Sequence, residues 1–339
     1  MIPAYQKLAD SLESLRGTGK SSRGLAFFEG GREYYLYLLQ SQTGTYVPVG
    51  QIEKRLSAQL LSDYREISSL LEQNSSLIDR LNQCSGELTL TPTQMLEKLP
   101  ELMKKDFPEL KDASYELRTV HPSMKKFLSP AFYLTPPVDT RNPNVIYIND
   151  SGHTSSLELF GTLAHEGFPG HLYQTVSFAE NNPSDIRYLV ASSGYVEGWA
   201  TYVESYAYDY AADYLSAGTL SSQEASACTR LSWLNRSVNL CIYSLIDIGI
   251  HYRGWDAART AVFLKAFGIN NASTAAEIYQ YIVETPGNYL KYYWGYLNFL
   301  DLKTVCQKRL GDDFDLKEFH RRILDIGPVQ FPVLEKYMK

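Results

Sequence analysis

Apolar residues recur every three or four positions along most of this chain, a spacing that is typical of amphipathic α-helices. In the N-terminal third this period predicts helices over residues 5–15, 51–81 and 91–105. From Ser155 onward it predicts helices almost to the end, over residues 155–168, 171–181, 194–215, 221–252, 256–267, 272–284, 287–310 and 315–325. The chain is therefore predicted to be mainly helical.

The period changes to two between residues 114 and 149. Three segments alternate like β-strands and are separated by proline-rich turns: residues 115–120, 131–134 and 144–149. We therefore expect a mainly α fold with a small antiparallel β-sheet, an α+β arrangement. A helical N-terminal region over residues 1–112 is expected to pack as one unit with a second region, residues 113–339, which contains the sheet.

Composition and charge exclude some classes of function. The chain has 339 residues, of which 44% are apolar, a net charge of −6 and no basic face, so binding to nucleic acid is not expected. No stretch reaches the ~18 apolar residues of a membrane span, and the start lacks a signal peptide. We expect a soluble chain, cytoplasmic if complete and exported if an N-terminal segment was removed. No pattern predicts an oligomeric state.

The cysteines suggest neither a zinc ribbon nor a disulfide framework. Cys84, Cys228, Cys241 and Cys306 are far apart and form no C-x-x-C pair. They are expected to be core thiols.

Candidate chemistry is concentrated in residues 165–171, His-Glu-Gly-Phe-Pro-Gly-His. In the zinc-peptidase motif H-E-x-x-H two histidines bind the metal and the glutamate activates a water, but here the second histidine comes six positions after the first. In a regular helix such positions differ by about 240° and ~9 Å, too far for one metal at about 2.0–2.1 Å. Pro169 and Gly170 favour a break at residues 168–170 that would turn His171 back towards His165. The alternative is an ordinary helix end with two unrelated histidines.

A second pair of candidates lies on the next predicted helix. Glu197 and Glu204 are seven positions apart and so share one face, which is otherwise apolar and aromatic. Carboxylates are seldom buried without a partner. A ligand from this helix would complete a site of two histidines and one glutamate with an open fourth position. The alternative is two solvated surface glutamates.

These motifs resemble a known family. His-Glu-x-x-Pro-Gly-His, followed by Glu-Gly-Trp-Ala-x-Tyr-x-Glu over residues 197–204, is similar to the bacterial domain of unknown function 885 family, which is grouped with the zincin-like metallopeptidases. Asp-x-Gly-x-His-x-x-Gly-Trp over residues 247–255 and Pro-Gly-x-x-x-x-Tyr-x-x-Gly over residues 286–295 continue the resemblance. Family members are commonly longer at the N-terminus, so the chain resembles their C-terminal portion. The family often has an arginine just before Asp247, where this chain has Tyr243 and the more distant Arg236.

The resemblance implies a zincin-like fold and a zinc-dependent metallopeptidase, a hydrolase of peptide substrates. His165, His171 and Glu197 would hold one Zn²⁺. Glu166 would take a proton from the activated water and pass it to the leaving amine.

Further residues receive supporting roles from the same resemblance. Glu204 would orient a ligand histidine. His251 and Tyr292 would donate hydrogen bonds to the oxyanion of the tetrahedral intermediate. For both oxyanion donors, a purely structural place in the core is the alternative.

Other readings remain open or can be set aside. Residues 144–149 are expected to form an edge strand along the cleft that pairs with substrate backbone. A di-iron site is disfavoured, because none of the six histidines follows a glutamate by three positions. A non-catalytic zinc-binding or peptide-binding protein on a degenerate peptidase fold is the alternative function, although Glu166 favours activity. His121, His153 and His320 are expected to be structural or surface residues.

Overall fold

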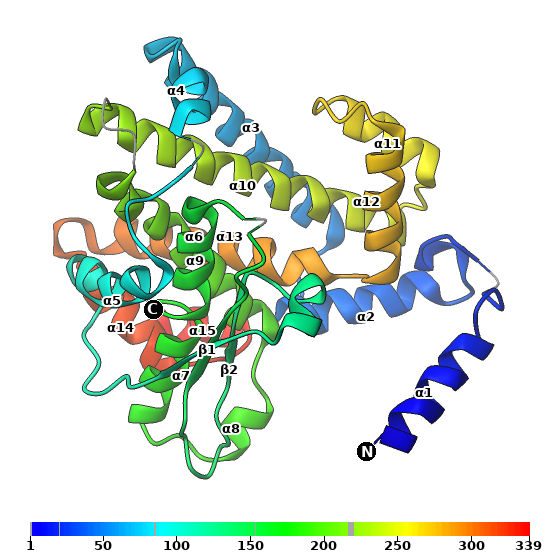
Figure 1. Ribbon diagram of the computed structural model, residues 1–339, viewed down its shortest axis with the longest axis horizontal. Helices are drawn as coiled ribbons and strands as arrows, with labels where there is room; N and C mark the ends of the chain where they lie inside the picture. Colours follow the sequence, from blue (N-terminus) through cyan, green and yellow to red (C-terminus); the bar gives the residue numbers. More distant parts are fainter. Residues whose placement is uncertain (1, 20, 85, 153, 216–219) are drawn as a thin grey trace. The chain divides into compact units, whose positions relative to one another are not determined.

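The computed structural model describes residues 2–19, 21–84, 86–152, 154–215 and 220–339 (Figure 1). The chain forms two compact units. The first comprises Met1–Leu38 with Ile246–Gly287, and the second comprises Leu39–Leu245 with Asn288–Lys339. The boundary predicted after residue 112 lies within the second unit, and that division stays a prediction.

Helices make up most of the chain, so the expectation of a mainly α fold with a small sheet is confirmed. The first unit contains α1 (Ile2–Ser14), α11 (Ala257–Lys265) and α12 (Ala272–Glu284), while α2 (Gly31–Thr43) and α10 (Ser222–His251) have residues in both units. The second unit contains the other helices: α3 (Val49–Gln73), α4 (Leu77–Cys84), α5 (Pro92–Leu102), α6 (Ser156–Glu166), α7 (His171–Glu180), α8 (Ile186–Leu189), α9 (Ser193–Ala211), α13 (Asn288–Leu310), α14 (Leu316–Ile326) and α15 (Phe331–Met338).

The helix predicted over residues 51–81 is in fact two helices, and its predicted extent was wrong. Helix α3 ends at Gln73 and α4 begins at Leu77. Between them, Oδ1 of Asn74 accepts hydrogen bonds from the backbone N–H and the hydroxyl of Ser76, at 3.1 and 2.8 Å. Such side-chain bonds compete with the helical ladder, so the break needs neither proline nor glycine. Helices α2, α8 and α15 are additional to those that the apolar period predicts.

The three predicted strands form one sheet, but its pairing differs from the expectation. The strands are β1 (Glu116–Thr119), β2 (Ala131–Leu134) and β3 (Val145–Ile148), in the order β1-β3-β2. The sheet is mixed, because β3 is parallel to β1 and antiparallel to β2. The expectation that residues 144–149 form an edge strand was wrong, since the chain inserts β3 between two partners. Strands β1 and β2 form the edges of this sheet.

Helix α9 packs along α13 and also against α6 (Figure 1). The contact with α13 requires glycine on both helices. A Cβ added at Gly198 would lie 2.5 Å from the backbone of Gly295, and one added at Gly295 would lie 2.2 Å from the carbonyl oxygen of Gly194. The two helices therefore touch backbone to backbone. This contact fixes where Glu197, one residue before Gly198, lies relative to the first turns of α13.

Two further expectations concern the cysteines and the membrane. Cys228, Cys241 and Cys306 are buried in the core, in agreement with the sequence, while the side chain of Cys84 lies outside the described residues. In the part of the chain that the structure describes, no helix has both the length and the apolar character needed to cross a membrane.

Candidate metal centre

The predicted break lies between α6 and α7 and is confirmed. Helix α6 ends at Glu166, and α7 begins at His171. The backbone N–H of Gly167 still reaches Leu163 O at 2.8 Å, and the N–H of Tyr173 returns to Gly167 O at 3.1 Å, so the turn is closed at both ends. The indole N–H of Trp199 on α9 donates to Pro169 O at 2.8 Å. The turn is therefore tied to the helix that carries Glu197.

The turn brings the two histidines together with Glu197. The imidazole rings of His165 and His171 lie 4.7 Å apart between centroids and are nearly perpendicular, at 89°. Nε2 of His165 lies 3.6 Å from Glu197 Oε2, and Nε2 of His171 lies 3.4 Å from the same oxygen. One ligand atom from each of the three residues lies within 4.8 Å of the others.

These separations match the needs of a zinc ion. In tetrahedral coordination at about 2.0–2.1 Å, neighbouring ligand atoms lie about 3.4 Å apart. The 3.4 and 3.6 Å that separate Glu197 Oε2 from the two imidazole nitrogens agree with this value. Two imidazoles and one carboxylate are also a donor set that zinc enzymes use while keeping one position for water or substrate.

A buried carboxylate holds the far side of His165. Nδ1 of His165 lies 2.7 Å from Glu204 Oε1, and Glu204 is only 3% exposed. Arg236 on α10 donates to Glu204 from Nε at 3.0 Å and from Nη2 at 3.4 Å. A carboxylate on the second nitrogen fixes the tautomer and orientation of a metal-binding histidine. Because Arg236 balances its charge, Glu204 can stay ionised in the interior.

The electrostatics of this group favour a bound cation. Burial alone would lower the pKa of His165, but hydrogen bonds to Glu197 and Glu204 outweigh it and raise the pKa to about 10. Burial would raise the pKa of Glu197, yet the two imidazoles hold it well below its usual range. Burial likewise opposes ionisation of Glu204, but Arg236 and His165 lower its pKa to about 2. Both carboxylates are thus anionic at neutral pH, and a metal dication can replace the proton on His165.

Glu166 adjoins the ligand group without belonging to it. Its Oε2 accepts a hydrogen bond from the backbone N–H of Tyr133 at 2.9 Å. Tyr133 lies on the edge strand β2, and its N–H does not take part in the ladder with β3. Glu166 is therefore held by the sheet rather than by His165, His171 or Glu197.

Helix α13 brings two more side chains to this group. Nζ of Lys291 lies 3.7 Å from Glu197 Oε1, the oxygen that does not face the imidazoles. The ring centroid of Tyr292 lies 6.2 Å from that of His165. The predicted oxyanion donor Tyr292 is thus close to the centre.

His251 belongs to the first unit and is completely buried there. Its Nδ1 accepts from the N–H of Leu25 at 3.1 Å, and Nε2 lies 2.9 Å from Ile282 O. Both ring nitrogens are thus engaged by backbone groups. Burial lowers the pKa of this histidine, in keeping with a neutral ring. Its role as an oxyanion donor stays a prediction.

Two of the three histidines without a predicted role in the chemistry lie within the described residues. His320 is buried and stacked on Phe107, with Nδ1 2.7 Å from Asp106 O, which agrees with a structural role. The exposed His121 caps a short 3-10 helix through Ser123 N. His153 lies outside the described residues.

Two residues at this centre are not predicted by the sequence. Arg236 lies too far before Asp247 to replace the family's arginine, and no motif assigns a role to Lys291. Because a buried carboxylate requires a cationic partner, Glu204 on an apolar helix face predicts that a cationic side chain lies beside it. Which cation reaches it depends on how α10 and α13 pass α9.

Comparison with known proteins gives a family and a fold. The family model described as "Bacterial protein of unknown function (DUF885)" matches residues 1–338. The chain belongs to the DUF885 family. This family match extends well beyond the motifs between residues 160 and 295. Among curated proteins, no sequence is similar enough to count as a relative.

Two solved structures share the fold of this DUF885 chain. One, from Colwellia psychrerythraea, has a TM-score of 0.79 at 22% identity, and the other, from Shewanella oneidensis, has 0.69 at 16%. Both are named putative lipoproteins, the second "of unknown function". The chain is covered to 99% and 98%, but spans only 59% and 63% of those two proteins.

Proposed function

We propose that this chain is a zinc-dependent metallopeptidase with a zincin-like fold. The observation that carries the proposal is the convergence of His165, His171 and Glu197 at tetrahedral ligand spacing. Two neighbouring carboxylates support the proposal. Glu204 accepts a hydrogen bond from the second ring nitrogen of His165, and Glu166 lies beside the group without belonging to it. A structural zinc site closes with four protein ligands, whereas three ligands with an adjacent carboxylate suit hydrolysis.

Each residue near the centre has its own role in the proposed hydrolysis. A bound zinc would lower the pKa of a water molecule to near neutrality and polarise the substrate carbonyl. Glu166 accepts the proton of the attacking water and delivers it to the leaving amine. Lys291 holds Glu197 Oε1 and so leaves Oε2 directed at the imidazoles. Tyr292 donates a hydrogen bond to the developing oxyanion, a contribution typically of ~10²–10³ in rate.

The edge strand β2 supports a peptide as the substrate. Its outer edge lies at Glu166, since Tyr133 N–H points there. The edge of a strand can pair with the backbone of an extended peptide, here through groups other than Tyr133 N–H, which Glu166 already engages. The strand that would pair with the substrate backbone is therefore β2 and not β3.

Metal removal tests the proposed function. We expect the zinc-loaded chain to cleave members of a random peptide library, followed by mass spectrometry, and to lose cleavage after a chelator strips the metal. Added zinc should restore it, because the ligand set is preformed. Cleavage that is indifferent to the chelator would contradict a zinc mechanism. Bound zinc without any cleavage would support the alternative, a non-catalytic zinc-binding protein.

A further inference from the structure

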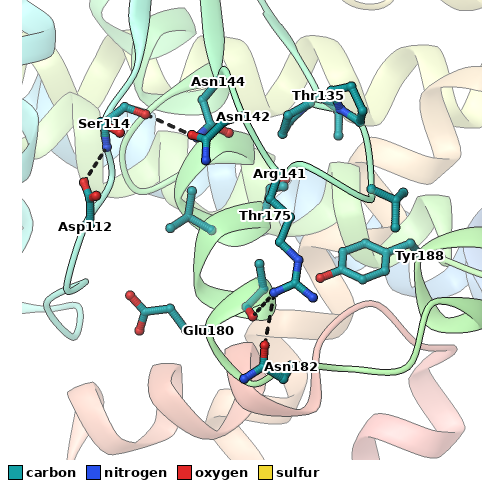
Figure 2. Close-up of a pocket in the computed structure, with 15 residues that line it drawn as sticks. Asp112, Ser114, Thr135, Arg141, Asn142, Asn144, Thr175, Glu180, Asn182 and Tyr188 are labelled. Carbon is teal, nitrogen blue, oxygen red and sulfur yellow. Dashed lines mark hydrogen bonds between the residues drawn. The ribbon is translucent and has the colours of Figure 1, made fainter.

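A pocket of about 460 Å³ lies in the second unit, against helix α7 (Figure 2). Thr175, Val176 and Ala179 of α7 form one wall, and the proline-rich segment of residues 135–138 after β2 forms another. Tyr188 of α8 also borders the pocket, and Figure 2 shows the Arg141 side chain beside its ring, with Arg141 Cζ 5.9 Å from the ring centroid. Prolines, valines and Ala179 make part of the walls apolar, and the other lining residues carry polar or charged side chains.

The pocket adjoins the candidate metal centre through two elements. Helix α7 begins with His171, and Thr175 is one turn further on the same face, about 6 Å away. Tyr133 makes the second connection. Its backbone N–H holds Glu166, while its hydroxyl donates to Asn144 Oδ1 in the pocket wall at 2.7 Å. A ligand that reaches both places can therefore be a single extended molecule.

Arg141 is the one positively charged side chain among the described residues that line this pocket. It is partly buried, and its Nη1 donates to Ala179 O at 3.0 Å and to Asn182 Oδ1 at 3.2 Å (Figure 2). No hydrogen bond of Nε or Nη2 joins it to another described residue. Those two groups form one side of the guanidinium fork, the geometry that binds a carboxylate through two parallel bonds.

The acidic side chains of the pocket are less suited than Arg141 to bind a charged group of a ligand. Asp112 and Glu180 are both exposed. Each already accepts a backbone hydrogen bond, from Ser114 N and Lys111 N, both at 3.0 Å. Among the charged groups that line the pocket, Arg141 is therefore the one that is partly buried, whereas both carboxylates face solvent.

We propose that this pocket binds a carboxylate of the peptide substrate on Arg141, an inference that rests on the proposed function. Ala179, which holds Arg141, is eight residues beyond His171, about 12 Å along α7. An extended peptide covers about 3.3 Å per residue, so the carboxylate lies roughly three to four residues from the cleaved bond. A free C-terminus at that distance makes the chain a peptidase that releases short C-terminal fragments. An aspartate or glutamate side chain there is the other source of the same group.

Binding to a cleavage-deficient protein tests the pocket independently of turnover. The zinc-loaded Glu166→Gln chain is titrated with three labelled hexapeptides. The first has a free C-terminus, the second has the same sequence with an amidated C-terminus, and the third is amidated and has one residue, three from the end, replaced by glutamate. We expect one carboxylate form to bind about ten- to a hundredfold more tightly than the plain amide. The form that gains shows which carboxylate is bound.

Variants at the pocket complete the experiment. Arg141→Met should remove the preference and Arg141→Lys should keep part of it, while Arg118→Met, which removes an exposed arginine paired with Glu116, should leave it unchanged. Equal binding of all three peptides, or no binding of any, overturns the pocket proposal. If the unmodified chain cleaves peptides without a carboxylate preference, only the pocket proposal fails. If the preference is present but nothing is cleaved, only the proposed function fails.

Discussion

Replacing Glu166 with glutamine is expected to lower peptide hydrolysis by about 10²–10⁴-fold while leaving the zinc content unchanged. Glutamine has the same shape and keeps an oxygen that can accept the hydrogen bond from Tyr133 N–H. It cannot accept the proton of the attacking water at neutral pH. Because Glu166 lies outside the group formed by His165, His171 and Glu197, the metal should stay. Initial rates and metal analysis of one preparation give both results.

A glutamate on the same helix provides the matched control. Glu158 closes the capping box at the start of α6, and glutamine serves equally well in that position. Glu158→Gln should therefore keep both zinc and activity. If Glu166→Gln loses its zinc, the residue is a ligand and the proposed role is wrong. If it keeps full activity, the proton acceptor is another group.

Gly170→Ala is expected to destroy the turn between α6 and α7. An added Cβ would lie 1.8 Å from the carbonyl oxygen of His165 and 2.3 Å from that of Ala164. Both are backbone atoms of the helix that carries His165, so they cannot move without displacing that residue. We expect the free energy of unfolding to fall by more than about 4 kcal/mol, a loss seen only where a special feature is broken. Zinc affinity should fall with it, because His171 follows directly.

Gly50 supplies the control for that substitution. It lies in helix α3, and an added Cβ would meet no atom within 4 Å. Gly50→Ala should therefore raise stability by about 0.5–1 kcal/mol, since alanine costs less conformational entropy in a helix. Urea denaturation of both variants, with and without zinc, measures the effects. A Gly170→Ala chain that unfolds at the same urea concentration as the unmodified chain and binds zinc equally well would contradict the account of the turn.

The sequence predicted the elements well where local chemistry decides them. Pro169 and Gly170 predicted the helix break, because proline has no N–H to donate to a helical hydrogen bond and glycine permits close backbone approach. The strands also agree, since their alternation is local. Strand order does not follow from the local pattern. β3 pairs directly with β1 in parallel although β2 comes between them in the sequence, and only tertiary packing decides that arrangement.

The three residues of the candidate metal centre could be predicted from the sequence, but the charged side chains that support them could not. His165, His171 and Glu197 stand in recognisable motifs, and Glu204 shares a helix face with Glu197. Arg236 and Lys291 lie on other helices, and their contacts depend on how the helices pass each other.

The close approach of α9 and α13 shows the same limit. Gly198 and Gly295 appear in the sequence as motif glycines, yet nothing local reveals that each faces the other's backbone. That contact brings Glu197 next to Lys291, and so determines part of the charge around the proposed metal site.

The zinc content of the purified chain tests the central claim most directly. After loading with zinc and removal of the excess, the unmodified chain should retain about one zinc ion, in keeping with a single three-ligand site. His171→Ala and Glu197→Ala should each retain less than about a tenth of that amount, because each removes one ligand of three. Gly50→Ala, treated in the same way, should retain the full amount. Stoichiometric zinc that survives both ligand substitutions would contradict the site described here.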